Sequence, residues 1–484
     1  MYEPAEPPPP GPTDPHPAPD RPAPEPGPAD AFLGALRETL GPGLTTVDAD
    51  VLETYRTDSA PLCASGTPLA LVRPRSTEDV VKVMRLADRY AVPVVPQGAR
   101  TGLAGGANAV EGCVLLSLER MNAIVSIDPV NQTAVVQPGV VNADFSRAVA
   151  EQGLHYPPDP ASWESSTLGG NVATNAGGLC CVKYGVTTDF VLGLEVVLAD
   201  GDVLRTGRRT VKGVAGYDLT RLFVGSEGTL GVVTEITLRL VPPAQVPLTA
   251  VAFFPAMEPA CDTVTELMRG PVRPSLLEIM DRPSVDAVGS YRDLGFPADA
   301  QAVLMTQSDR GPLAPDDLRH FEEVAARHGG EVMIAADPAE GEMLLAARRL
   351  LAPALERLGA FLSDDVCVPR SALTDLVSGV AGIAERHRLL ITCSGHAGDG
   401  NMHPTVVFDR NIPEQVERAQ TAFEEIMSLG LELGGTITGE HGVGTLKAPW
   451  LERELGPVGL RVQRDVKRLF DPKNLINPGK VLAR

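Results

Sequence analysis

The sequence predicts an α+β protein of two domains, and three observations carry this prediction. The chain has 484 residues, which is too many for one ordinary hydrophobic core. Helix-like and strand-like segments are mixed through its first half. The glycine-dense character of that half stops after Pro242-Pro243. We therefore place a boundary near residue 245, with one domain over residues 31–245 and the other over 246–484.

Composition is that of an ordinary globular protein, with 43% hydrophobic and 21% charged residues. A formal net charge of −20 argues against a nucleic-acid partner, because phosphate binding needs clustered Lys and Arg. No run of about 18 apolar residues is present, and no basic segment followed by an apolar one begins the chain. We therefore expect a cytoplasmic protein without a signal peptide. The seven cysteines form no Cys-x-x-Cys pair, so structural disulfides are not expected.

The first elements follow a proline-rich start. Residues 1–30 hold 13 prolines and almost no apolar side chains, so we expect a disordered tail. Residues 31–36 begin the first apolar helix face. Thr77 is expected to cap a second helix, whose apolar face is formed by Val80, Val81, Met84 and Ala87.

Strands dominate the rest of the first domain, with a helix expected over residues 143–150. The expected strands cover residues 92–95, 114–118, 133–136, 191–198, 203–206 and 229–240. Asp200-Gly201 separates two of these strands and favours the positive φ angles of a tight hairpin turn.

Four glycine-rich segments of the first half can bind an anion: residues 96–102, 105–106, 169–178 and 225–231. Glycine lets backbone N–H groups approach phosphate closely, so together these segments suit a dinucleotide pyrophosphate. Any one of them alone would be explained more simply by turn glycines. None has the Gly-x-Gly-x-x-Gly order of a Rossmann unit, which disfavours a nicotinamide dehydrogenase.

Two glycine-flanked segments of the second half contain three of the eight histidines, His396, His403 and His441. Gly398, Asp399 and Gly400 have low helix propensity, so we expect a loop between two elements here. The imidazoles of His396 and His403 are expected to point inward from it. Imidazoles and the carboxylate of Glu440 suit zinc or another divalent transition metal. Either segment alone would more simply hold hydrogen-bonded loop histidines, but their combination with the glycine-rich segments favours metal ligands.

Together these motifs resemble the vanillyl-alcohol oxidase and p-cresol methylhydroxylase (PCMH) family of FAD-linked oxidases, from about residue 66 to the end. Within that family the chain resembles the flavin subunit of glycolate oxidase and the D-lactate and D-2-hydroxyglutarate dehydrogenases. The resemblance implies a two-subdomain PCMH-type FAD-binding domain and a ferredoxin-like α+β substrate domain, with residues from about 441 returning to the FAD-binding domain. The matching segments are residues 158–160, 169–171, 175–178, 216–219, 226–231 and 477–479.

The resemblance also implies which residues hold FAD. Phosphate contacts are expected from residues 98–102, Gly105 and Gly106, flavin contacts from Asp159 and residues 171–178, and adenine contacts from residues 231–234, while Asn477 closes over the ring. No histidine lies in the first phosphate loop, so non-covalent FAD is expected. The complete implied set is Pro96, Gly98, Ala99, Arg100, Thr101, Gly102, Gly105, Gly106, Pro158, Asp159, Thr167, Gly169, Gly170, Asn171, Ala173, Thr174, Asn175, Gly177, Gly178, Glu227, Gly231, Val232, Val233, Thr234 and Asn477.

In the second domain the resemblance assigns His396, His403 and Glu440 to a divalent metal, with zinc expected. It assigns His441 to proton transfer, for which a near-neutral pKa would be suitable. Arg348 matches the arginine that binds the substrate carboxylate, and Arg370 is a second candidate. Without the resemblance, each arginine would be explained as a solvated surface residue.

The resemblance implies FAD-dependent oxidation of a small 2-hydroxy acid to the 2-oxo acid by hydride transfer. Leu345 replaces a tryptophan of many relatives, and Pro404-Thr405 stand where relatives acting on 2-hydroxyglutarate carry Asn two residues after the histidine. These departures favour glycolate or D-lactate. A D-2-hydroxyglutarate dehydrogenase, an electron-transfer subunit without its own substrate site and a metal-dependent hydrolase stay open as alternatives. The electron acceptor, partner redox subunits and membrane association through such subunits also stay open.

Overall fold

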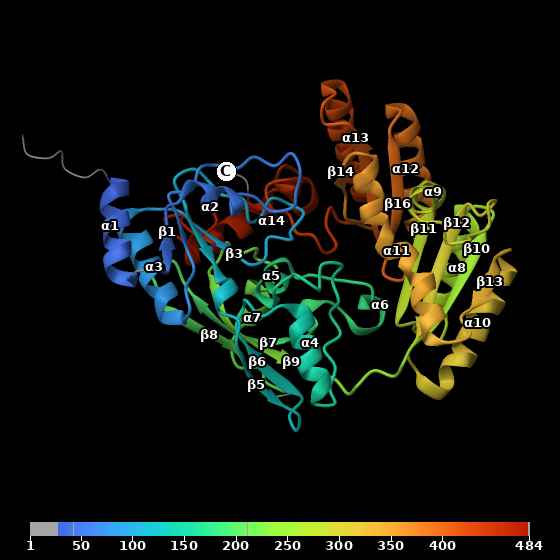
Figure 1. The fold of residues 1–484 in the computed structure, drawn as a ribbon, viewed down its shortest axis with the longest axis horizontal. Helices are drawn as coiled ribbons and strands as arrows, with labels where there is room; N and C mark the ends of the chain where they lie inside the picture. The colour runs from blue at the N-terminus through green and yellow to red at the C-terminus, as the bar shows by residue number, and fades with distance from the viewer. Residues whose placement is uncertain (1–27, 42, 211, 483–484) are drawn as a thin grey trace, which may run out of the picture.

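The structure is a computed structural model that describes residues 28–41, 43–210 and 212–482 (Figure 1). The expected disordered tail, residues 1–30, lies outside the described residues except for its last three positions. Those three positions begin helix α1 (Pro28–Leu40).

The first sheet of the N-terminal unit is mostly parallel, in the order β1-β2-β4-β3. Its strands are β1 (Thr45–Thr46), β2 (Ala70–Val72), β3 (Val94–Gln97) and β4 (Val114–Ser117), and β2 and β3 run parallel to β4. Helices α1 and α3 (Thr77–Tyr90) cover one face of this sheet, whereas Leu52 of α2 (Ala49–Thr54) packs on the other. Successive side chains of each strand therefore enter different cores.

The cap predicted for α3 is one residue out of place. Ser76 is the N-cap, and its Oγ accepts a hydrogen bond from the backbone N–H of Asp79 at 3.3 Å. Thr77 instead donates its hydroxyl to Glu195, 2.7 Å away on a strand of the second sheet. Ser76 and Thr77 both carry a hydroxyl that could cap the helix. Because the Thr77 hydroxyl is bonded to Glu195, Ser76 is the cap.

The second sheet is antiparallel, in the order β5-β6-β9-β7-β8. Its strands are β5 (Ile124–Asp128), β6 (Thr133–Val136), β7 (Val191–Val197), β8 (Val203–Gly207) and β9 (Val232–Arg239). The core against it is completed by α4 (Asn142–Glu151), α5 (Leu168–Thr174) and α7 (Leu219–Phe223). Gly201, in the turn between β7 and β8, has a φ of +84°, as its Asp-Gly sequence predicts.

The third sheet forms the C-terminal unit and is antiparallel throughout, in the order β13-β10-β12-β11-β16-β17-β14, with β15 also paired to β17. Its strands are β10 (Leu248–Phe254), β11 (Leu276–Asp281), β12 (Ala302–Ser308), β13 (Glu331–Ile334), β14 (Ala360–Ser363), β15 (Val366–Cys367), β16 (Leu390–His396) and β17 (Asn401–Phe408). The first four strands, with α8 (Met257–Arg269) and α10 (Ala314–Arg327), form a βαββαβ arrangement. The predicted ferredoxin-like α+β fold of the second domain is thus confirmed.

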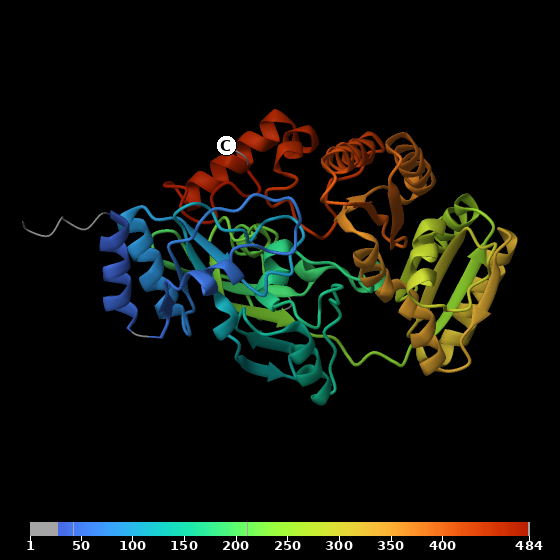
Figure 2. The same ribbon diagram turned by 45° about the horizontal axis from the view of Figure 1, so that its top comes forward.

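Helices cover both faces of this sheet (Figures 1 and 2). Residues such as Leu277 and Ile279 face a core shared with α8, α10, α12 (Leu373–His387) and α13 (Pro413–Glu432). Met280 and Met305 face the opposite core, which α9 (Arg282–Tyr291) and α11 (Pro338–Leu358) complete. The second of these faces carries the side chains of the candidate site.

The end of the chain returns to the N-terminal unit, and Figure 2 shows it in red above the blue and green elements. Helix α14 (Leu451–Phe470) is kinked at Gly456-Pro457, and the ring of Phe470 lies 5.2 Å from that of Phe223. The other connection between the units joins β9 to β10, and the boundary that we place at residue 245 falls within it. Among the described residues, no helix combines the length and apolar character needed to cross a membrane.

Candidate active site

A cleft lies where the glycine-rich loops of the N-terminal unit meet. The predicted FAD-binding residues that line it are Pro96, Gly98, Ala99, Arg100, Thr101, Gly102, Gly106, Thr167, Gly170, Asn171, Ala173, Thr174, Gly177 and Glu227. Asp58, Leu103, Ala104, Ala107, Pro160, Ala161 and Ser162 also line it and were not predicted, whereas Ala176 lies within residues 171–178, which were expected to contact the flavin. Glu440 and His441, which come from the C-terminal half, complete the lining.

Other predicted FAD-binding residues lie outside the lining: Gly105, Pro158, Asp159, Gly169, Asn175, Gly178, Gly231, Val232, Val233, Thr234 and Asn477. Several of them support the residues that do line the cleft. The Asn477 amide donates to the carbonyl groups of Gly106 and Glu227, at 3.0 and 2.8 Å. Thr234 is buried in β9, where its hydroxyl bonds to Glu195. The contacts of these residues with FAD stay predictions.

Close packing explains two of the glycines. A Cβ atom at Gly98 would lie 2.3 Å from Oγ1 of Thr167, the residue that caps α5. A Cβ atom at Gly177 would lie 2.3 Å from Oε2 of Glu440. Both distances are far below van der Waals contact, so a side chain at Gly177 would displace the carboxylate that joins the cleft to the histidine cluster.

Glu227 connects the last glycine-rich loop to the loop that follows His441. Its carboxylate accepts hydrogen bonds from the backbone N–H groups of Val443 and Gly444, at 2.6 and 2.8 Å. Burial raises the pKa of Glu227 to about 7, although these two bonds act to lower it. The carboxylate therefore holds two segments of distant sequence together at the edge of the cleft.

A β-hairpin brings His396 and His403 together. Ser394 of β16 is paired with His403 of β17, and alternate residues of a strand share a face, so His396 lies on the same face as His403. The ring centroids of the two histidines are 5.0 Å apart. The expected loop between two elements is thus a short turn, residues 397–400, between paired strands.

One carboxylate oxygen lies at the centre of the histidine cluster. Glu440 Oε1 is 3.2 Å from His396 Nε2, 3.3 Å from His403 Nε2 and 3.8 Å from His441 Nε2. The ring of His441 stacks on that of His403, with centroids 4.9 Å apart. Three imidazole nitrogens directed at one carboxylate oxygen form a donor set that suits a divalent transition metal.

Asp365 is a further member of this cluster that the sequence analysis missed. Its carboxylate forms, with His403, Glu440 and His441, a group whose ligand atoms all lie within 4.8 Å of one another. Its Oδ1 is buried without a hydrogen-bond partner, as are Nδ1 of His403 and Nδ1 of His441. Burying a polar atom without a partner is unfavourable, and a bound cation with its ligands would give such atoms partners. The residues present therefore fit a metal.

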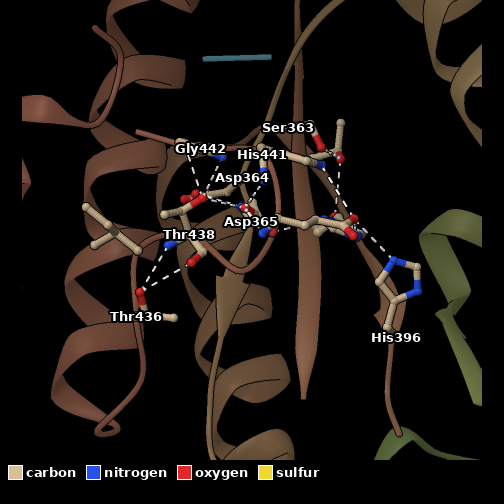
Figure 3. A network of polar contacts seen from close by, with 12 residues as sticks. Ser363, Asp364, Asp365, His396, Thr436, Thr438, His441 and Gly442 are labelled. Carbon is tan, nitrogen blue, oxygen red and sulfur yellow. Dashed lines mark hydrogen bonds and ion pairs between the residues drawn. The ribbon is translucent and has the colours of Figure 1, made fainter. Parts of the chain in front are cut away.

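The other oxygen of Asp365 organises the loop that carries Glu440 and His441, and Figure 3 shows this carboxylate beside Thr438 and His441. Oδ2 accepts from the hydroxyl of Thr438 at 2.7 Å and from the backbone N–H groups of Glu440 and His441 at 2.9 and 2.8 Å. Burial opposes ionisation here, but the positive charges of His441, in its protonated form, and of Lys447 hold the pKa of Asp365 well below its usual range. An ionised Asp365 thus fixes the backbone of the loop.

His441 is neutral at physiological pH. Burial lowers its pKa to about 4, although the carboxylate of Asp365 acts to raise it. The near-neutral value expected from the sequence is therefore wrong for this buried ring. An unprotonated imidazole in the lining of the cleft can still accept a proton.

The two candidate arginines occupy different surroundings. Arg348, on α11, is mostly buried, and its Nε donates to Oε2 of Glu278 at 2.9 Å. The other oxygen of Glu278 lies 2.6 Å from Nδ1 of His396, so Arg348 belongs to the cluster. Arg370 is exposed and donates to the carbonyl of Gly398 in the turn between the histidines.

Glu278, like Asp365, was missed from the sequence although a signal is present. It is a single charged residue within the apolar run Leu276-Leu-Glu-Ile-Met280, and Asp364-Asp365 is an acidic pair beside Val366. Charged residues inside apolar strands are rarely buried without partners. Their partners lie far away in the sequence, among them His396 at 118 residues from Glu278 and Glu440 at 75 residues from Asp365, so the sequence alone does not identify them.

Comparison with protein families gives two matches that together extend over most of the chain. A model described as "FAD binding domain" matches residues 68–207, and one described as "FAD linked oxidases, C-terminal domain" matches residues 244–481. The chain belongs to the FAD-linked oxidases.

Individual relatives agree with this assignment. The glycolate oxidase subunit GlcD of Bacillus subtilis is 44% identical, covering 89% of this chain and 92% of the relative. The subunit of the same name from Escherichia coli K12 is 38% identical, covering 93% and 90%. A D-lactate dehydrogenase of Anaerostipes hadrus is 34% identical, covering 91% and 95%. The resemblance drawn from the sequence is thus confirmed.

The fold is shared with less similar proteins of known structure. p-Cresol methylhydroxylase with substrate bound superposes with a TM-score of 0.78 at 20% identity, covering 94% of this chain and 97% of that one. The 4-ethylphenol oxidase of Gulosibacter chungangensis gives a TM-score of 0.76, also at 20% identity, covering 93% and 96%. The predicted PCMH-type FAD-binding domain is therefore confirmed, and FAD is the cofactor of this family-wide domain.

Proposed function

We propose that this FAD-linked oxidase converts a small 2-hydroxy acid, glycolate or D-lactate, into the 2-oxo acid. One observation carries the proposal: Glu440 and His441 belong both to the lining of the FAD-binding cleft and to the histidine cluster. Relatives named as a glycolate oxidase subunit and a D-lactate dehydrogenase support this substrate class. In hydride transfer, an alcohol loses a proton from oxygen and a hydride from carbon. The boundary between the FAD-binding cleft and the histidine cluster brings a hydride acceptor and a proton acceptor together.

Bound groups supply part of the chemistry. FAD supplies the hydride acceptor, and a divalent ion, with zinc expected, held by His396, His403 and Glu440 supplies a Lewis acid that lowers the pKa of the substrate hydroxyl. The chain itself supplies the base. His441 is neutral because it is buried, and we propose that it accepts the hydroxyl proton.

The substrate carboxylate is proposed to bind Arg348. Glu278 engages Nε of this arginine, and the two terminal guanidinium nitrogens have no partner among the described residues. A guanidinium can donate two parallel hydrogen bonds to one carboxylate, so it can hold and orient a 2-hydroxy acid. Pro404-Thr405 stand where relatives acting on 2-hydroxyglutarate carry Asn, so a second substrate carboxylate has one polar partner fewer, which is why we favour glycolate or D-lactate over 2-hydroxyglutarate.

Electrons on reduced FAD need an acceptor. Because two relatives are named as glycolate oxidase subunits, we propose that this chain passes its electrons to a partner redox subunit. In an assay of the purified chain, an artificial electron acceptor such as a dye can take the place of this partner subunit. If the purified chain reduces a dye with glycolate or D-lactate, it carries its own substrate site. Failure with every 2-hydroxy acid would favour the electron-transfer alternative.

The variant His441→Ala tests the proposed base. We expect it to keep FAD, because His441 contributes only one of many residues of the cleft, and to lose turnover by about 10²- to 10⁴-fold. The ratio of flavin to protein absorbance and dye reduction with saturating substrate measure the two effects. His328→Ala is the control, because this histidine pairs with Glu266 on the surface of the C-terminal unit. Near-normal turnover in His441→Ala would contradict the proposed role.

A further inference from the structure

Glu278 is a fully buried carboxylate in the middle of strand β11, between Leu277 and Ile279. Burying an isolated charge in an apolar core is strongly unfavourable unless that charge is paired and hydrogen bonded. The neighbours of Glu278 along the strand are aliphatic, so its partners must come from other elements.

Two elements supply these partners. His396 Nδ1, at the end of β16, lies 2.6 Å from Glu278 Oε1, and Arg348 Nε, on α11, donates to Oε2 at 2.9 Å. The pairing of Ile279 with Gly395 places Glu278 directly across from His396, so the sheet itself fixes this contact. One carboxylate thus joins a candidate metal ligand to the candidate substrate arginine.

Donor and acceptor chemistry then determines the state of His396. An arginine Nε is always a donor, and an ionised carboxylate only accepts. His396 Nδ1 must therefore carry a hydrogen to bond with Glu278, and in the neutral ring Nε2 is left with its lone pair. That Nε2 atom is the one that faces Glu440, at 3.2 Å.

We propose that Glu278 is a positioning residue that selects the metal-binding tautomer of His396 and, through the same carboxylate, orients Arg348. The inference rests on the proposed function and deepens it, because it makes the metal ligand and the substrate arginine depend on one group. Carboxylates commonly orient metal-binding histidines in this manner. In this protein the second oxygen of Glu278 accepts a hydrogen bond from Arg348, the proposed substrate-binding residue.

Glu278→Gln tests the proposal with almost no change in shape. A glutamine offers one accepting oxygen and one donating NH₂ group, so it cannot accept from both Arg348 and His396. If its oxygen keeps Arg348, the NH₂ group faces Nδ1 of His396 and drives the hydrogen to Nε2, where it blocks the lone pair. If the amide turns over, Arg348 loses its acceptor.

We expect the affinity for zinc to fall by about 10- to 100-fold in Glu278→Gln, as is usual when the partner of a metal-binding histidine is lost. Competition between the FAD-loaded enzyme and a chelator measures it. KM for glycolate or D-lactate should rise as well, whereas the FAD content should stay unchanged. Asp281→Asn is the matched control, because Asp281 is a buried carboxylate of the same strand that bonds to Ser284 and the backbone of Cys393. It should keep the wild-type zinc affinity.

The outcomes separate this inference from the proposed function. Wild-type zinc affinity in Glu278→Gln, or an equal loss in Asp281→Asn, overturns the role of Glu278 alone. An active wild-type enzyme that binds no divalent metal overturns the metal site and this inference together. Should Glu278→Gln not fold, ¹⁵N spectra of histidine-labelled wild-type enzyme give a second measurement. The signal lost in His396→Asn should be that of a ring protonated at Nδ1, and protonation at Nε2 would overturn the proposal.

Discussion

Three buried carboxylates hold other residues of the candidate site in position. Glu278 orients His396, Asp365 holds the backbone of Glu440 and His441, and Glu227 holds that of Val443 and Gly444. All three are buried. Each bonds to donors from distant segments, so each holds one part of the site against another.

The raised pKa of Glu227 predicts a dependence of stability on pH. In the unfolded chain this group titrates near 4.5, whereas in the folded protein its pKa is about 7, so the folded state binds the extra proton between these values. The stabilising contribution is complete below pH 4.5 and is lost as the pH rises through 7. We therefore expect the thermal midpoint to fall less between pH 5 and pH 8 in Glu227→Gln than in the wild type.

Differential scanning fluorimetry of the FAD-loaded proteins at the two pH values measures this difference. Asp364, Asp159 and Asp281 also have raised pKa values, but they are present in both proteins and cancel in the comparison. The same fall in both proteins would show that Glu227 does not titrate in this range.

Among the elements, the segment after α14 acts as a clasp on the FAD-binding cleft. Ile476 pairs with Val94, Asn477 bonds to the carbonyls of Gly106 and Glu227, and Lys480 Nζ donates to the carbonyl of Gly105 at 2.9 Å. Lys480 is buried, and it places a positive charge beneath the loop that is expected to receive the pyrophosphate.

Lys480→Met should weaken FAD binding by about tenfold, the equivalent of about 1.4 kcal/mol, because it removes one charge-assisted hydrogen bond beneath that loop. Titration of the apoprotein with FAD, followed by flavin fluorescence, measures the dissociation constant. Lys473→Met is the control, since Lys473 is an exposed lysine of the same segment that pairs with Asp88. Equal FAD affinity in the two variants would contradict the role of the clasp.

Sequence patterns located most elements of the first half, because alternation and glycine turns act over a few residues. The strands 133–136, 191–197 and 203–207 lie where they were expected. Sheet order could not be predicted in the same way, since β9 pairs with β6 and β7 across long stretches of chain. The same limit applies to the site. His396, His403 and Glu440 can be recognised as site residues from their glycine-flanked segments. Glu278 and Asp365 can be recognised only from their partners, which are distant in the sequence and come close on folding.

At the scale of the whole molecule, the site exists only where the two units meet. Gly177 of the N-terminal unit packs against Glu440, and Glu227 bonds to the loop after His441. Lys183 and Tyr184 of α6 (Cys181–Tyr184) bind Asp309, which follows β12, and so join the units at a second place. The FAD-binding cleft and the histidine cluster are therefore brought together by packing between the two units and not by proximity in the sequence.

The central claim is that a 2-hydroxy acid gives its hydride to the flavin at this boundary, with the aid of a metal held by the histidine cluster. Anaerobic mixing of the FAD-loaded enzyme with glycolate or D-lactate, before and after removal of divalent metal by a chelator, tests it most directly. We predict rapid bleaching of the oxidised flavin band at about 450 nm, at least 10²-fold slower bleaching after chelation, and recovery with added zinc. No bleaching with any 2-hydroxy acid, or equal rates with and without the metal, would contradict the account.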